Sequence, residues 1–159
     1  GVVSAILFVD NAGSDVVLGM LPFARELLRR GARVILSANE TPALNDVTHL
    51  ELEALVARAA AGDAVLAGGL ASGRLALLSS GGGLPLLDLR ALAPALQREV
   101  AARPPDLVVL EGMGRAVESN WRARLRVDAL KIAMIKDESV ARFLGGALYD
   151  LVCRYETAR

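Results

Sequence analysis

The chain has very few of the residue types on which several classes of protein depend. It contains one cysteine, Cys153, and one histidine, His49, among 159 residues. A single cysteine excludes an internal disulfide framework and an all-cysteine zinc site, and a single histidine leaves no set of imidazoles for a zinc centre. Cys153 falls in a helical pattern, so we expect it to pack as a small side chain. We interpret His49 as a surface or helix-capping residue.

An excess of either charge is also absent, as is any long apolar run. Lys plus Arg and Asp plus Glu each number 18, so the chain lacks the basic surplus that is typical of nucleic-acid binding. We interpret the arginine-rich stretch 122–126 as a solvated surface. Charged residues interrupt every apolar run before the ~18 residues that a membrane helix needs, and no signal peptide is visible. We therefore expect a cytoplasmic protein that binds neither nucleic acid nor a membrane.

Apolar residues, by contrast, are abundant, and their pattern predicts the fold. They make up 53% of the chain and aromatic residues only 4%, which indicates a core of Leu, Val and Ala in a single domain. Continuous apolar runs, typical of strands covered on both faces, occupy residues 5–9, 34–37, 75–78, 107–110 and 130–135. Helical patterns occupy residues 16–30, 47–61, 88–102, 139–144 and 148–155. We expect Pro22 to kink the first helix or to delay its start. The alternation predicts an α/β protein, a three-layer α/β/α fold with a mostly parallel, Rossmann-like sheet.

The junction after the first predicted strand carries the strongest functional signal. Residues 10–15 read Asp-Asn-Ala-Gly-Ser-Asp and lie between a buried strand and a helix start. Asp10 and Asn11 offer the oxygen ligands that hard cations prefer, and the amides around Gly13 and Ser14 suit a phosphate at a helix N-terminus. A helix cap would explain Asp10 as well, if this junction stood alone.

Polar residues also follow three other predicted strands. Because the carboxyl ends of parallel strands meet at one edge of a sheet, we expect these residues to line a common site. They comprise Asn39 and Asn45-Asp46 after the second strand, Ser79-Ser80-Gly81 after the third, and Glu111 to Arg115 after the fourth. The Gly112-Met113-Gly114 turn matches part of a dinucleotide-binding loop but has Val117 in place of the third glycine. A non-catalytic Rossmann-like module that binds a nucleotide or a partner protein is therefore the alternative function.

Together these residues suit metal-dependent phosphoryl chemistry. Asp10, Asn11 and Asp46 supply three oxygen ligands and leave positions for water and substrate, as magnesium or manganese prefers. Lys131 and Lys136 interrupt the last apolar strand, where a salt bridge explains a lysine as well as a phosphate does. We favour phosphate for Lys131. The predicted catalytic residues are Asp10, Asp46 and Lys131, with water or a carboxylate as the attacking group. The predicted phosphate- and substrate-binding residues are Gly13, Ser14, Asn39, Glu111, Arg115 and Lys131.

Five ordered blocks make this hypothesis more specific. They are residues 10–22, 42–48, 110–115, 130–136 and 144–150. In these blocks the chain resembles the metal-dependent damage-control phosphatase family, in the subfamily that includes the C-terminal domain of pantothenate kinase 4. The resemblance implies an α/β/α phosphatase that uses manganese, cobalt, nickel or magnesium. It places the metal ligands at Asp10, Asn11 and Asp46 and the phosphate-binding lysine at Lys131. It also implies 4′-phosphopantetheine, its oxidised derivatives or sugar phosphates as substrates.

Members of this family carry a helical region ahead of the first block, and this sequence does not contain it. The chain starts at Gly1 and enters a predicted strand within a few residues. We therefore expect residues 1–159 to be a single catalytic domain from the C-terminal portion of a longer protein. The expected partners are a small phosphorylated metabolite and the missing N-terminal region, which would help to close the pocket, and an oligomer is compatible with the sequence. Weak activity, altered specificity or an inactive folding remnant are the expected consequences of that missing region.

Overall fold

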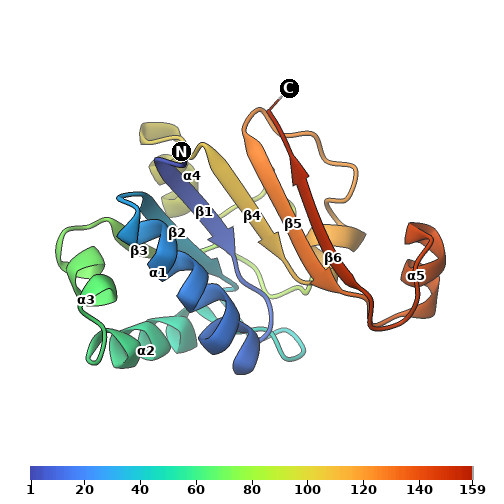
Figure 1. Ribbon diagram of the computed structural model, residues 1–159, viewed down its shortest axis with the longest axis horizontal. Coiled ribbons are helices and arrows are strands. Elements are labelled where there is room, and N and C mark those ends of the chain that lie inside the picture. The colour runs from blue at the N-terminus through green and yellow to red at the C-terminus, as the bar shows by residue number, and fades with distance from the viewer. Residues whose placement is uncertain (159) are drawn as a thin grey trace.

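The computed structural model describes residues 1–158, which form one six-stranded sheet with helices on both faces (Figure 1). The strands are β1 (Ser4–Phe8), β2 (Arg33–Ala38), β3 (Leu75–Ser79), β4 (Leu107–Glu111), β5 (Asp128–Met134) and β6 (Leu151–Glu156). The helices are α1 (Leu21–Arg29), α2 (His49–Ala60), α3 (Ala64–Ala71), α4 (Pro94–Ala102) and α5 (Glu138–Leu144), with π-helical segments η1 (Asp15–Met20) and η2 (Met113–Glu118). The strand order is β3-β2-β1-β4-β5-β6, in which only β6 runs antiparallel to its neighbour. The predicted α/β class and mostly parallel sheet are confirmed.

Two apolar cores, one on each face of the sheet, hold these elements together. Leu7 of β1 belongs to the core under α1, α2 and α3, together with Leu52 of α2. Ile6 and Phe8 belong to the opposite core, together with Leu96 of α4. A strand buried on both faces needs apolar residues at every position, which explains the continuous run that predicted β1. Within residues 1–158, no helix is long and apolar enough to cross a membrane.

The first helix begins later than its apolar pattern, as Pro22 led us to expect. The chain leaves β1 through the π-helical segment η1 and enters α1 at Leu21, with Pro22 in the first turn. Proline is tolerated there because the first N–H groups of a helix have no partner within the helix. The delayed start is confirmed, and η1 places Asp15 beside the end of β1.

The prediction of a helix over 148–155 is wrong, because this segment forms the edge strand β6. The left-handed residue Gly145 ends α5, and the chain turns back so that Leu151 pairs with Met134 and Glu156 with Ala129. A short edge strand is buried on one side only, so its few apolar residues resemble a helical pattern. Cys153 is therefore exposed on β6 and does not pack in a core.

One further helix begins later than predicted, and another was not predicted. Helix α4 begins at Pro94 instead of near Asp88, because the Asp88 carboxylate accepts from the backbone and side chain of Arg90 at 2.9 Å in the preceding loop. Helix α3 was not predicted, although Asp63 caps it by accepting from the backbone N–H groups of Val65 and Leu66. Asp63 followed by an apolar run was the signal for this helix.

Candidate active site

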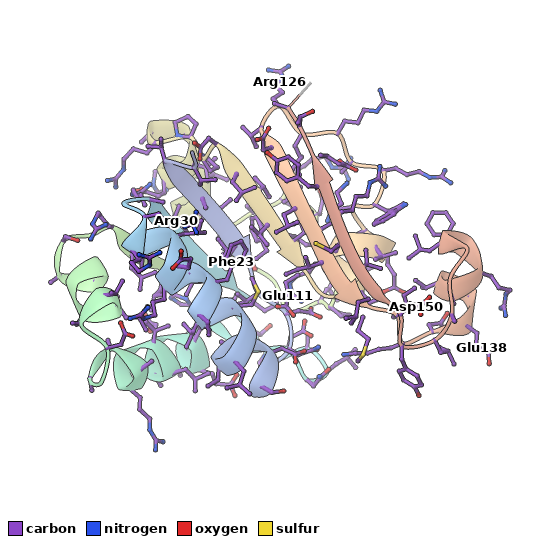
Figure 2. All side chains as sticks on the ribbon, in the orientation of Figure 1. Phe23, Arg30, Glu111, Arg126, Glu138 and Asp150 are labelled. Atoms are coloured by element: carbon purple, nitrogen blue, oxygen red, sulfur yellow. The ribbon has the colours of Figure 1, made fainter. Side chains whose placement is uncertain are left out.

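Most of the polar residues predicted to converge do so at the carboxyl edge of the sheet. The exception is Ser79-Ser80-Gly81, where Ser80 Oγ donates to the Ala38 carbonyl and the Gly81 N–H donates to Ser79 Oγ, both at 3.0 Å. Asp10 and Asn11 follow β1, Asn39 follows β2, and Glu111 ends β4 (Figure 2 labels Glu111 at this edge). The buried polar residues gathered here are Asp10, Asn11, Asn39, Asp46, Glu111 and Arg115, each at most 8% exposed. Burying so many polar groups is unfavourable unless they bond to one another, so their mutual contacts define the site.

Backbone hydrogen bonds fix Asp46 against the end of β1. Asn11 and Asp46 form an isolated antiparallel bridge, and the Val47 N–H donates to the Asp10 carbonyl at 2.8 Å. Directly after this bridge, Thr48 caps α2 in a reciprocal capping box with Glu51. The loop that carries Asp46 is therefore held at both ends, and it brings Asp46 beside Asp10 at the end of β1.

The guanidinium of Arg115 is the centre of the site. Its Nη1 donates to both Asp10 and Asp46, the latter at 3.0 Å, and its Nη2 donates to Asn39 Oδ1 at 3.0 Å. Asn39 closes the ring by donating from Nδ2 to the same Asp46 oxygen at 3.1 Å. Burial lowers the pKa of Arg115 to about 10, so the side chain remains a cation at neutral pH.

Glu111 lies under Asp10 and is held in its neutral form. Its Oε2 accepts from the Asp10 backbone N–H at 2.6 Å. Burial, with the negative charge of Asp15 second, raises the pKa of Glu111 to about 8, although Lys136 acts in the opposite direction. At neutral pH the carboxyl group therefore carries a proton and can donate a hydrogen bond.

The structure does not bring Lys131 to this site, which corrects the prediction that Lys131 meets the phosphate. Its side chain is 0% exposed, and its Nζ donates to the carbonyls of Trp121 and Ala123 and to Glu156. Lys131 lies in the middle of β5, not at its carboxyl end, so it cannot reach the site edge. It ties the loop after η2 to the sheet, which is the salt-bridge explanation that the sequence also allowed.

Lys136, and not Lys131, is the lysine at the site. Asp15 also lies there, although the sequence analysis assigned it no role. Lys136 follows the carboxyl end of β5 and lines a 450 Å³ cavity together with Asn11, Asp15 and Glu111. Asp15 accepts from Asn11 Nδ2 at 2.8 Å and so orients the Asn11 side chain. The signal for Lys136 was its place just beyond a strand end, where the other site residues also stand.

The Gly13-Ser14 turn is exposed beside this cavity, where its amides were predicted to meet phosphate. Gly13 has φ +80° and begins the turn into η1, and the Val17 N–H donates to its carbonyl at 3.0 Å. The turn directs the chain from Asn11 to Asp15, so both the carboxamide and its partner depend on it. The role of these amides in binding phosphate remains a prediction.

The glycines of the Gly112-Met113-Gly114 turn are explained by packing within the chain. Gly112 has φ +96°, and the Asp10 carboxylate fills the space that a Cβ would take. A Cβ on Gly114 would collide with the Pro85 carbonyl. Because the Asp10 side chain and Pro85 fill the space beside both glycines, a nucleotide phosphate could not come close to the backbone of this turn. This weakens the alternative function, a Rossmann-like module that binds a nucleotide.

The donor set fits a hard divalent cation. Within residues 1–158 no group of three or more His, Cys, Asp or Glu side chains could hold a metal, so a cation held here by Asp10 and Asp46 would need a further donor such as the carboxamide of Asn11. Asp10, Asn11 and Asp46 provide only oxygen donors, as magnesium and manganese prefer. The carboxylates of Asp10 and Asp46 already bind a buried cation, the guanidinium of Arg115. This position therefore favours positive charge.

Comparisons with known proteins identify relatives of the chain. The chain is 46% identical over 151 residues to a damage-control phosphatase of Arabidopsis thaliana, covering 95% of this chain and 40% of that protein. It is 36% identical over 199 residues to a mouse (Mus musculus) 4′-phosphopantetheine phosphatase, covering 96% of this chain and 24% of that protein. The fold matches a DUF89 family protein from Pyrococcus horikoshii with a TM-score of 0.69 at 20% identity, covering 99% of this chain and 48% of that one.

The chain thus spans less than half the length of these relatives. The model of the damage-control phosphatase ARMT1-like domain matches residues 2–152, which is nearly the whole chain. This match, together with the 46% identity to a named member, assigns the chain to the ARMT1-like damage-control phosphatase family.

Proposed function

We propose that this domain hydrolyses phosphate monoesters of small metabolites with the help of a divalent cation held by Asp10, Asn11 and Asp46. The observation that carries the proposal is the convergence of the Asp10 and Asp46 carboxylates on one buried positive charge at the carboxyl edge of the sheet. Ligand sites in parallel α/β sheets lie at this edge. Family membership supports phosphatase chemistry.

The family resemblance implies manganese, cobalt, nickel or magnesium as the cation, and a site with oxygen donors alone suits manganese and magnesium best. When bound, such a cation supplies Lewis-acid polarisation of the phosphoryl group. The residues of the chain supply the rest. Lys136, on the rim of the cavity, is placed to neutralise phosphoryl oxygens in the role that the sequence assigned to Lys131. The amides of Gly13 and Ser14 would donate hydrogen bonds to the same group.

The carboxyl of Glu111 adds a proton donor beside the reacting group. In the metal-free chain burial raises its pKa to about 8, and it borders the same cavity as Lys136. A neutral acid in a phosphatase site can hydrogen-bond a phosphoryl or leaving oxygen without adding negative charge. The choice between water and a carboxylate as the attacking group is left to experiment.

For the substrate we propose 4′-phosphopantetheine or its damaged derivatives, with sugar phosphates as the second class. One relative is named a 4′-phosphopantetheine phosphatase. The lining of the cavity is mixed, with the polar residues Asn11 and Lys136 and the apolar residues Met113, Met134 and Leu151. A substrate that carries both a phosphate and a weakly polar arm suits such a lining.

The test is hydrolysis of p-nitrophenyl phosphate and 4′-phosphopantetheine with manganese, cobalt, nickel or magnesium, each with and without chelator. Asp10→Ala and Asp46→Ala are expected to reduce activity to background. The matched control is Asp88→Ala, which removes a carboxylate from an exposed loop and should leave activity unchanged. Activity that survives both the chelator and Asp10→Ala would overturn the proposal.

A further inference from the structure

Arg115 contacts the same oxygens that a divalent cation would need. Its Nη1 lies between the Asp10 and Asp46 carboxylates, and its Nη2 binds Asn39 Oδ1. The side chain is 1% exposed, and its positive charge is the one that these two carboxylates share. Two buried carboxylates side by side repel each other, so a counter-cation is required for this arrangement to be stable.

The backbone of Arg115 is firmly held, whereas its head group is held only by these ligands. The Arg115 carbonyl accepts from Asn120 Nδ2 at 2.9 Å and from Ser119 Oγ at 3.2 Å. Gly112, at the start of η2, is pressed against Asp10. If a new charge binds at the site, we therefore expect the guanidinium of Arg115 to move and η2 to stay in place.

A divalent cation and a guanidinium repel each other strongly at the separation that two shared carboxylates impose. Both cannot neutralise Asp10 and Asp46 fully at the same time. The guanidinium has five N–H donors, so it can leave one carboxylate and still keep Asn39 as a partner. The N–H groups that it frees would then suit the oxygens of a phosphate.

We propose that Arg115 is a built-in counter-cation that keeps the Asp10–Asp46 pair assembled without metal and competes with the divalent cation for it. This inference rests on the proposed function in one respect, namely that the two aspartates are metal ligands. Two consequences distinguish a competing arginine from a purely structural one. The metal-free protein folds with Asp10 and Asp46 in place, and it binds a divalent cation more weakly than the same ligands would bind it without Arg115.

The experiment measures manganese affinity by calorimetry in the full chain. Arg115→Met removes the competing charge while keeping an apolar stem, and we expect it to bind manganese about tenfold more tightly than wild type. The same variant should have a lower Tm without metal and a larger rise in Tm on adding manganese. The control is Arg98→Met, which removes an exposed arginine of α4 and should change neither quantity.

Since Arg115→Met can fail to fold, a second measurement uses wild-type protein. The ¹⁵N-labelled guanidinium of Arg115 is followed by NMR during titration with magnesium, which is diamagnetic. We expect its slowly rotating Nη groups to lose restraint or shift as magnesium saturates the site. An Arg115 signal that does not change at saturation overturns the inference.

The outcomes separate this inference from the proposed function. Asp10-dependent manganese binding with equal or weaker affinity in Arg115→Met would overturn only the role of Arg115 as a competitor. No manganese binding in wild type, with binding in Arg115→Met, would support the inference in its strongest form. An absence of binding in both proteins, together with an unchanged NMR signal, would overturn the metal site and the inference together.

Discussion

The carboxylate of Asp10 lies where a side chain on Gly112 would have to be, so the ligand and the glycine occupy one space. The two residues follow the neighbouring strands β1 and β4, which pair in parallel. Gly112 also has φ +96° and ψ 153°, a conformation that is essentially restricted to glycine. Close packing and backbone geometry therefore require glycine at this position independently of each other.

We expect Gly112→Ala to destabilise the chain by about 3 kcal/mol and to abolish metal-dependent activity, because Asp10 has to move. The matched control is Gly82→Ala. Gly82 also has a positive φ, +69°, but nothing lies within 4 Å of its absent Cβ. The control should lose only about 1 kcal/mol of stability, because alanine is strained in a left-handed backbone conformation, and it should keep its activity. Urea unfolding and p-nitrophenyl phosphate hydrolysis measure the two effects, and equal losses in both variants would contradict the packing argument.

Stability should fall with rising pH because of Glu111. Its pKa is raised from 4.5 to about 8 in the folded chain by burial. The folded state therefore holds this proton over a range in which the unfolded state has lost it. The contribution of Glu111 to the stability of the fold is complete below pH 4.5, its pKa in the unfolded chain. It is lost as the pH rises through about 8, its pKa in the folded chain.

Glu111→Gln tests this dependence, because the amide cannot ionise and its oxygen can still accept from the Asp10 N–H. In chelator, urea unfolding from pH 5 to pH 8.5, a range that brackets most of the expected loss, should show wild type losing stability relative to Glu111→Gln. Parallel pH curves for the two proteins would show that Glu111 ionises normally in the folded chain.

The two lysines of the last parallel strand should separate stability from catalysis. Lys131→Met leaves the carbonyls of Trp121 and Ala123 without their buried donor, and it breaks the contact with the partly exposed Glu156. We expect a loss of about 2 kcal/mol in stability, with kcat/KM of the folded fraction nearly unchanged.

Lys136→Met should behave in the opposite way, because Lys136 is exposed at the rim of the cavity. Its stability should stay within about 0.5 kcal/mol of wild type, while kcat/KM should fall roughly tenfold or more with the loss of one charge-assisted hydrogen bond. Steady-state kinetics and urea unfolding of both variants decide the matter. A catalytic loss on Lys131→Met at full stability would restore the original assignment.

These two lysines also show how far the sequence could predict the site. The strands were predictable because a parallel strand buried on both faces leaves a continuous apolar run, and the ends of those runs located Asp10, Asn39 and Glu111. Which lysine reaches that edge depends on where β5 ends. The apolar run 130–135 ended within one residue of the observed strand end, so the place of Lys136 just beyond it was visible in the sequence. Lys131 was favoured because it interrupts that run, and its partner Glu156 lies on β6, which was not predicted as a strand.

The role of Arg115 could not be predicted for a different reason. It was expected to line the pocket, but its partners Asp10, Asp46 and Asn39 lie 105, 69 and 76 residues away in the sequence. No local pattern encodes such contacts, since they depend on the register of β1, β2 and β4. Strand β6 was missed because six residues at an edge are too few to distinguish alternation from a helical pattern.

The capping box of α2 should influence metal binding, although it does not touch the site ligands. Thr48 accepts from the Glu51 N–H, and Glu51 in turn accepts from the Thr48 N–H at 2.8 Å. Thr48 also forms a parallel bridge with Asn39, so it anchors the loop that carries Asp46. We expect Thr48→Ala to cost about 1 kcal/mol and to weaken manganese binding, because the Asp46 loop becomes less restrained.

The matched control is Asp137→Ala, which removes the cap of α5 and leaves the loop that carries Asp46 untouched. Asp137 accepts from the Ser139 and Val140 N–H groups at 2.7 and 3.1 Å. This variant should lose a similar amount of stability, about 1 kcal/mol, while its manganese affinity stays that of wild type. Urea unfolding and manganese calorimetry of both variants provide the comparison. If Thr48→Ala binds manganese as tightly as Asp137→Ala does, then Asp46 is held by its bridge to Asn11 alone, and the helix cap contributes only stability.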